Sequence, residues 1–178
     1  LRHSRGRGVL GFEQVRTLDL RTNAMSIQYN SIEPNKYMLL PTSTISLIGE
    51  KALSSSYTDY HIALSPDTSA VFSILTTKTL EREHHYYSQN IIREVTTTMT
   101  YDDYGNQTKL VTDDGRVKTT VTNVYKNDLT RWYLGRLTSS TVRKKLEGAP
   151  DQVRKSSFTY DTATGLLSSE SIDVSNKK

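Results

Sequence analysis

The stretch EVTTTMTYDDYGNQTKLVTDDGRVKTTVTNVY, residues 94–125, decides the fold class of this chain. It contains three runs rich in Thr and Val, which favour the extended conformation. The runs are residues 94–101, 107–112 and 116–125. Turns that contain Gly105 and Gly115 separate them, and Asp114-Gly115 is a strong hairpin signal because a type I′ turn needs positive φ at both central positions. The stretch therefore predicts an antiparallel meander.

The remainder of the chain shows the same alternation of short β-branched runs with Gly, Pro and Asn turn residues, and helical periodicity is hard to find. Residues 79–85 could form one helical turn, although strand or loop is the favoured interpretation. The other expected strands are Gln14–Leu20, Thr42–Ile48, Ala52–Tyr60, Val71–Thr79, Tyr86–Thr100, Arg136–Val142, Val153–Tyr160 and Leu166–Asp173. The sequence predicts an all-β chain of antiparallel hairpins.

Composition limits what such a chain can do. Of 178 residues only 35% are hydrophobic, so a large self-sufficient core is not expected. The absence of cysteine excludes disulfides, thiol nucleophiles and sulfur-ligated metals. The 23 basic and 19 acidic residues are interspersed, which argues against nucleic-acid binding, and no apolar run is long enough for a membrane helix. The missing initiating Met leads us to expect a fragment of a longer polypeptide.

An internal repeat is visible when the turns are aligned. Tyr101-Asp102 precedes Gly105, and Tyr160-Asp161 precedes Gly165. The segment from Tyr125 to Leu137 lies between them and contains Trp132 and Gly135. An aromatic residue before an acidic turn residue and a glycine, at a period of about 20 to 35 residues, is typical of one supersecondary unit repeated along a stack.

This arrangement predicts the role of each residue type in the repeat. Gly105, Gly115 and Gly165 should occupy positive-φ turn positions. The two aspartates should accept local backbone N–H bonds. Tyr101 and Tyr160 should pack on the same side of successive hairpins.

At these residues the chain resembles the YD repeats of RHS-repeat proteins, in particular the shell-forming region of the B component of insecticidal Tc toxin complexes and related bacterial virulence-plasmid toxins. The first matching motif is Arg5-Gly6-Arg7-Gly8-Val9-Leu10-Gly11-Phe12, and the others are Tyr101-Asp102-x-x-Gly105-Asn106, Trp132-x-Leu134-Gly135-Arg136-Leu137-Thr138 and Phe158-Thr159-Tyr160-Asp161 followed by Thr164-Gly165-Leu166-Leu167. The resemblance assigns a structural repeat motif to Gly8, Gly11, Phe12, Tyr101, Asp102, Gly105, Asn106, Gly115, Trp132, Gly135, Tyr160, Asp161 and Gly165.

The resemblance implies that hairpins stack into a curved, hollow β-sheet shell around a toxic C-terminal segment. Residues 1–93 would form a loosely patterned shell segment and residues 94–178 the YD-repeat hairpins. The implied partners are other YD repeats of the parent chain, the encapsulated toxin and other toxin-complex components. The protein would be secreted by a bacterium, with any export signal outside these residues. The family's autoproteolytic aspartate motif is not found.

Motifs that could carry chemistry have simpler explanations in this sequence. Gly6-x-Gly8-x-x-Gly11 matches a dinucleotide fingerprint, but no strand precedes it and no helix follows, so a strand bend or close strand approach is favoured. His84 and His85 lie beside two glutamates, but consecutive strand residues point to opposite faces and cannot converge on one metal ion. Asp102-Asp103 and Asp113-Asp114 fit turn chemistry.

No serine lies in a nucleophile elbow, so the sequence predicts neither an enzyme nor a cofactor or metal site. The cations Arg143-Lys144-Lys145 are best explained as residues that discourage strand addition at an edge. The alternative function is a cell-surface carbohydrate or receptor-binding β module. In that case Trp132 and Tyr133 would form the contact surface, although packing between repeats is the favoured role for both.

Overall fold

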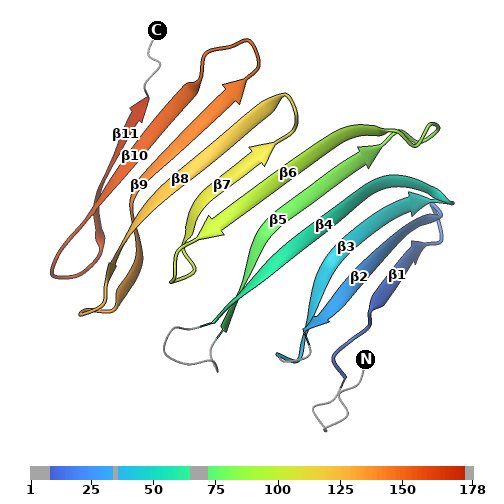
Figure 1. Cartoon of the computed structure of the whole chain (residues 1–178), viewed down its shortest axis with the longest axis horizontal. Helices are drawn as coiled ribbons and strands as arrows, with labels where there is room; N and C mark the ends of the chain where they lie inside the picture. Colours follow the sequence, from blue (N-terminus) through green and yellow to red (C-terminus); the bar gives the residue numbers. More distant parts are fainter. Residues whose placement is uncertain (1–8, 34–35, 65–71, 175–178) are drawn as a thin grey trace. The chain divides into compact units, whose positions relative to one another are not determined.

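The computed structural model describes residues 9–33, 36–64 and 72–174. In this part of the chain all regular structure is strand, which confirms the all-β prediction. The strands are β1 (Gln14–Asp19), β2 (Ala24–Glu33), β3 (Met38–Ile48), β4 (Lys51–Leu64), β5 (Phe72–His84), β6 (Ile91–Tyr101), β7 (Gln107–Asp113), β8 (Val117–Asp128), β9 (Tyr133–Leu146), β10 (Gln152–Tyr160) and β11 (Leu167–Val174). They form one open antiparallel sheet in sequence order, so each strand pairs with its neighbours in the chain (Figure 1).

The chain divides into two compact units. Unit 1 comprises the described residues of Leu1–Asp59 together with Thr79–Val95, and unit 2 comprises those of Tyr60–Lys78 together with Thr96–Lys178. The division proposed from the sequence, at residue 93, rests on repeat patterning and stays a prediction. Within unit 2 the connections β6–β7, β8–β9 and β10–β11 lie at the same end of the strands, because an antiparallel meander reverses direction at each turn.

Most expected strands are present, but β2 was not predicted. Met25, Ile27 and Tyr29 alternate with polar residues as in a half-buried strand, but the alternation covers only six residues and ends where a β-bulge shifts the pairing after Tyr29. Residues 79–84 belong to β5, which excludes the alternative helical turn, while residues 86–90 form a turn where a strand was expected. Pro41 lies inside β3, opposite Asn30 and beside a β-bulge, which is where a strand tolerates proline.

The β7–β8 turn also differs from its prediction. Gly115 has the expected positive φ of 82°, and Asp114 N–H donates to Val117 O across the turn at 3.2 Å. Arg116, the second central residue, does not have positive φ. A glycine with positive φ at the first central position alone meets the requirement of a type II′ turn rather than of the type I′ turn that we expected.

Burial in the sheet is slight, as the composition predicts. Among the described residues Ile27 is the one buried hydrophobic side chain and Ser55 the one buried polar residue, each 8% exposed. A globular domain normally buries one face of its sheet against a second layer. The described strands therefore depend on contacts between neighbouring hairpins more than on a shared core.

Candidate functional site: a ladder of contacts between successive hairpins

Three glycines of unit 2 mark equivalent positions in successive hairpins. Gly105, Gly135 and Gly165 follow one another at equal intervals of sequence and have φ values of 79°, 73° and 75°. Each begins a Gly-x-x-Thr/Ser motif that ends at Thr108, Thr138 or Ser168. The recurrence of one backbone conformation at one spacing identifies a structural repeat.

Each glycine lies against the preceding hairpin. A Cβ atom on Gly135 would lie 2.7 Å from Oδ1 of Asn106, and one on Gly165 would overlap the guanidinium of Arg136. Asn106 directly follows Gly105, and Arg136 directly follows Gly135. The glycine of one repeat thus covers the residue after the glycine of the repeat before it, and any larger side chain would have to displace that neighbour.

A side chain from each hairpin also caps a backbone carbonyl of the preceding one. The Tyr101 hydroxyl donates to Thr76 O at 2.8 Å, and the Tyr160 hydroxyl donates to Leu137 O at 3.0 Å. In the middle repeat Asn123 Nδ2 donates to Gln107 O at 3.0 Å. The side-chain type changes between repeats while the capped position is kept.

Each repeat contains a β-bulge at the same place, formed by the hydroxyl residue that ends the glycine motif. The pairing skips Thr108 between β6 and β7, Thr138 between β8 and β9, and Ser168 between β10 and β11. The Thr108 hydroxyl donates to Thr100 O at 3.2 Å, and the Thr138 hydroxyl donates to Val124 O at 3.0 Å. Ser168 Oγ lies 2.9 Å from the Thr159 hydroxyl. A bulge leaves backbone groups unpaired, and these hydroxyls hold the partner strand at that point.

The two Tyr-Asp turns are closed by their aspartates, as expected. Asp102 Oδ1 accepts the backbone N–H groups of Tyr104 and Asn106, at 3.0 and 2.8 Å. Burial alone would raise the pKa of Asp102, but hydrogen bonds from the Asn106 side chain and from these N–H groups outweigh it and hold the pKa below its ordinary value. The Asp102 turn is therefore built around an ionised carboxylate.

The Asp161 turn uses the same chemistry in a loop that is one residue longer. Asp161 Oδ1 accepts the N–H groups of Ala163 and Thr164, at 3.0 and 2.6 Å. The Thr164 backbone and hydroxyl, followed by the Ala163 N–H, lower the pKa of Asp161. Both turns therefore favour the charged form of their aspartate.

Arg136 is enclosed by neighbouring groups of unit 2. Its guanidinium lies 3.9 Å from the centre of the Tyr133 ring and 5.4 Å from that of Tyr160, within cation–π range of both. Gly165 covers it from the next turn, and Nη2 of Arg136 is buried without a hydrogen-bond partner in the described part of the chain. The two aromatic rings and the turn glycine Gly165 thus enclose a cation. In the equivalent contact of Gly105, the neighbouring side chain is the apolar Leu75.

Unit 1 contains a related contact with the two residue sizes exchanged. Gly11, at φ 125°, lies against Leu39, and a Cβ on Gly11 would lie 2.7 Å from Cδ2 of that leucine. Asn30 Nδ2 donates to Phe12 O at 2.7 Å, in the way that Asn123 caps Gln107. Thr42, skipped in the pairing of β2 with β3, donates its hydroxyl to Tyr29 O at 3.3 Å.

Several residues assigned to the repeat by resemblance lie elsewhere. Gly115 connects β7 to β8 at the other end of these strands, and a Cβ there would meet nothing within 4 Å. Trp132 is 73% exposed at φ 56°, whereas packing between repeats was expected. Phe12 is exposed and contributes its carbonyl rather than its ring to the ladder. Gly8 lies outside the described residues.

The hydroxyl residues of the bulges, Asn123 and the Gly11–Leu39 contact were not predicted from the sequence. The regular Gly-x-x-Thr/Ser spacing is the signal that could have identified Thr108, Thr138 and Ser168. Asn123 and Leu39 carry no such signal, because each side chain acts only through a strand that precedes or follows it.

The residues considered for metal binding have separate partners. His84 Nε2 lies 3.4 Å from Ser55 Oγ, while His85 Nδ1 accepts the Ser88 N–H at 3.2 Å. No group of three or more His, Asp or Glu side chains in the described ranges could hold a metal ion.

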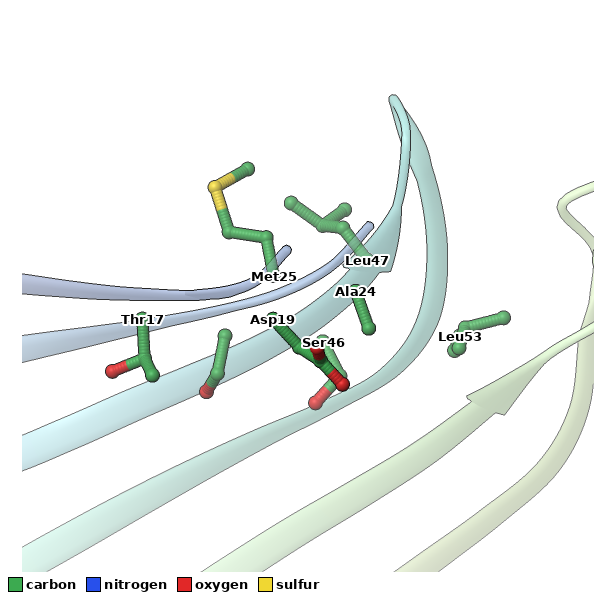
Figure 2. Close-up of a pocket in the computed structure, with 8 residues that line it drawn as sticks. Thr17, Asp19, Ala24, Met25, Ser46, Leu47 and Leu53 are labelled. Carbon is green, nitrogen blue, oxygen red and sulfur yellow. The ribbon is translucent and has the colours of Figure 1, made fainter. Parts of the chain in front are cut away.

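Each unit contains a hollow lined by described residues. The unit 1 hollow, about 260 Å³, lies at the β1–β3 strand ends, where Met25 and Leu47 point to one face and Thr17 and Ser46 to the other (Figure 2). Its lining groups do not converge on one point. The unit 2 hollow, about 420 Å³, is lined by His61, Asp103 and Asp102, among others, and the Asp102 carboxylate is already hydrogen-bonded within its own turn.

Comparisons with known proteins add no relative to these observations. No family model matches the sequence, and no curated protein matches it. Within the described ranges no helix is long and apolar enough to cross a membrane.

Proposed function

We propose that this chain is a non-enzymatic structural segment of a YD/RHS-repeat shell, which encloses the toxic C-terminal effector of a secreted bacterial toxin. Its partners are the other YD repeats of the parent chain, the enclosed effector and other components of the toxin complex. The sequence resemblance motivates the toxin context, and the geometry of the hairpins supports the role as a repeat.

The ladder of unit 2, meaning the glycine contacts of Gly105, Gly135 and Gly165 together with the carbonyl caps made by Tyr101, Asn123 and Tyr160, is the observation that carries the proposal. Each hairpin places its glycine against a side chain of the preceding hairpin and caps one of that hairpin's backbone carbonyls. Such nearest-neighbour contacts are how repeat proteins propagate, because each unit is completed by the next. The Tyr-Asp dipeptides that define the family resemblance lie within these contacts.

The scarcity of buried side chains supports the same proposal. With Ile27 as the one buried hydrophobic residue of the described chain, the sheet resembles a wall more than a compact globular domain. The outer strands β1 and β11 each have one paired neighbour in the described structure, which leaves an edge for further hairpins on both sides.

The test is to sequence the parent open reading frame and treat the full-length protein with protease. We expect further Tyr-Asp hairpins with the Gly-x-x-Thr/Ser spacing on one or both sides, and a C-terminal segment that is protected in the folded protein and cleaved after denaturation. A parent without further repeats, or a C-terminal segment cleaved equally fast in both states, would refute the shell.

The exposure of Trp132 favours one alternative, a carbohydrate or receptor-binding module. The structure separates the two residues considered for it, since Trp132 is 73% exposed while Tyr133 packs against Arg136. A glycan array read with Trp132→Ala and Tyr133→Ala variants distinguishes the two functions. Selective glycan binding that is lost in Trp132→Ala supports the carbohydrate or receptor-binding module. Absence of glycan binding, or binding that Trp132→Ala leaves unchanged, supports the structural shell segment.

A further inference from the structure

The turn between β5 and β6 presents an aromatic corner that the repeat contacts do not use. Tyr86 and Tyr87 are adjacent, with ring centres 5.1 Å apart and planes at 79°. Tyr87 is 78% exposed and Tyr86 is 37% exposed. The Tyr87 ring also lies 6.1 Å from the His85 ring, and most of its surface remains exposed to solvent.

This corner is held in place by hydrogen bonds on both sides of the two tyrosines. The Ala52 N–H of β4 donates to Gln89 Oε1 at 2.9 Å, and Gln89 Nε2 donates to Tyr86 O at 2.7 Å. The Ser88 N–H donates to His85 Nδ1 at 3.2 Å. A loop that is already ordered loses little conformational entropy when it binds a ligand, so its surface is suited to recognition.

A positive charge lies at the edge of the corner. Lys51 Nζ is 4.7 Å from the centre of the Tyr86 ring and 5.3 Å from that of Tyr87, within cation–π range of both. Lys51 forms no salt bridge with any described residue. An ammonium that has no carboxylate partner and lies beside exposed aromatic rings attracts a ligand that has both a stacking surface and an anionic group.

We propose that Tyr86, Tyr87 and Lys51 form a binding site for an acidic sugar, a pyranose that carries a carboxylate. The C–H face of the pyranose stacks on the Tyr87 ring, and the carboxylate pairs with Lys51. Asn90, exposed in the same turn, supplies an amide group suited to sugar hydroxyls, while the Ser88 hydroxyl contacts His85 Nδ1 at 3.1 Å and accepts the Asn90 N–H within the turn. Two rings are too small for the apolar centre of a stable protein interface, but they match one sugar ring. The site lies in unit 1 and is independent of Trp132 and of the shell proposal.

The experiment is isothermal titration of the full chain with three probes: 3′-sialyllactose, a disaccharide of glucuronic acid and N-acetylglucosamine, and neutral lactose. We expect at least one acidic probe to bind more tightly than lactose. Tyr87→Ala should weaken that binding on the order of tenfold, the usual effect of truncating a central aromatic contact. Lys51→Gln should reduce the preference for the acidic probe over lactose while leaving the fold intact.

Trp132→Ala is the matched control, since it removes an aromatic side chain of similar exposure in unit 2 and should leave the affinity unchanged. Tyr87→Phe keeps the aromatic ring and should retain binding, and an unchanged melting temperature of Tyr87→Ala separates loss of stacking from loss of folding. The proposal is overturned if neither acidic probe binds at millimolar concentration, if lactose binds equally well, or if Tyr87→Ala binds like the unaltered chain.

Discussion

The Gly11–Leu39 contact of unit 1 and the Gly165–Arg136 contact of unit 2 both place a glycine against a large side chain of another hairpin segment, but the order of the two residues along the chain is reversed. In unit 2 the glycine belongs to the later hairpin and covers a large side chain of the earlier one. In unit 1 the glycine lies ahead of β1, and the large side chain, Leu39, is on the later strand β3. The close approach needs one partner without a Cβ, but it does not matter which hairpin supplies it.

The comparison explains why the repeat is hard to recognise in unit 1. An alignment based on glycine finds Gly105, Gly135 and Gly165, because in these hairpins the small residue always has the same place. Leu39 occupies the glycine place in the β2–β3 hairpin, three residues before the bulged Thr42. Contacts between hairpins are conserved in geometry while the residues that make them are exchanged.

The largest effect is expected from filling the glycine contact of unit 2. Gly165→Ala and Gly148→Ala both place a side chain at positive φ, 75° and 74°, which costs on the order of 1–2 kcal/mol in each. Only at Gly165 does the new Cβ overlap Arg136 and Tyr133, and that displacement adds about 1–3 kcal/mol. Thermal or urea unfolding of the two variants measures the difference. Equal stabilities would show that Gly165 has only a conformational role.

The exchanged contact of unit 1 is tested by a double-mutant cycle. Gly11→Ala should destabilise the chain because the new Cβ displaces Leu39. Leu39→Ala removes that obstacle, so the double variant should be more stable than the sum of the two single changes by about 0.5–3 kcal/mol. Gly49→Ala, at φ 60° with nothing within 4 Å of its Cβ, is the control and should be additive with Leu39→Ala. If the effects of Gly11→Ala and Leu39→Ala were additive, these two residues would not interact, and unit 1 would lack the kind of glycine contact that is present in unit 2.

The carbonyl caps should contribute less than the glycine contacts. Tyr101→Phe and Tyr160→Phe each remove a hydroxyl donated to the preceding strand, and each should cost about 1 kcal/mol in the free energy of unfolding. Tyr104→Phe changes an exposed tyrosine outside the ladder and should have no measurable effect. A loss in Tyr104→Phe as large as in the other two would contradict the cap assignment.

The smallest expected effect is on the free energy of unfolding at acid pH, through the Asp102 carboxylate. Because the folded pKa of Asp102 lies below its ordinary value of 3.8, unfolding takes up a proton in this range. The contribution of the ionised Asp102 to the free energy of unfolding is therefore fully present above about pH 5. It is lost as the pH falls through 3.8, the ordinary pKa, and then through the lower pKa of the folded state. Asp102→Asn should flatten the acid limb of a stability-against-pH curve, while Asp103→Asn, outside this hydrogen-bond network, should not. An unchanged acid limb in Asp102→Asn would exclude a role for its charge.

Much of the fold follows from local signals in the sequence. The runs of Thr and Val around Asp102 and Gly115 predict strands and turns because both depend on side chains and backbone conformations a few residues apart. The strand β2 was not predicted although Met25, Ile27 and Tyr29 alternate with polar residues, because this local signal is short and ends at the bulge after Tyr29, where pairing with β3 continues the strand. The turn at Gly115 differs from the predicted type I′ turn because only one of its two central residues has positive φ, and a dipeptide does not determine the φ of the residue after it.

A series of antiparallel hairpins, with aspartates and positive-φ glycines in the Tyr-Asp turns, follows from the local sequence because those features arise within single hairpins. The residues that join one hairpin to the next are known only from the folded structure. Asn106 under Gly135, Arg136 under Gly165 and Leu39 over Gly11 are brought together by strand register and by bulges at Thr138, Ser168 and Thr42. A shift of one residue in that register would turn each of these side chains to the other face, so the contacts exist only when the whole ladder is formed.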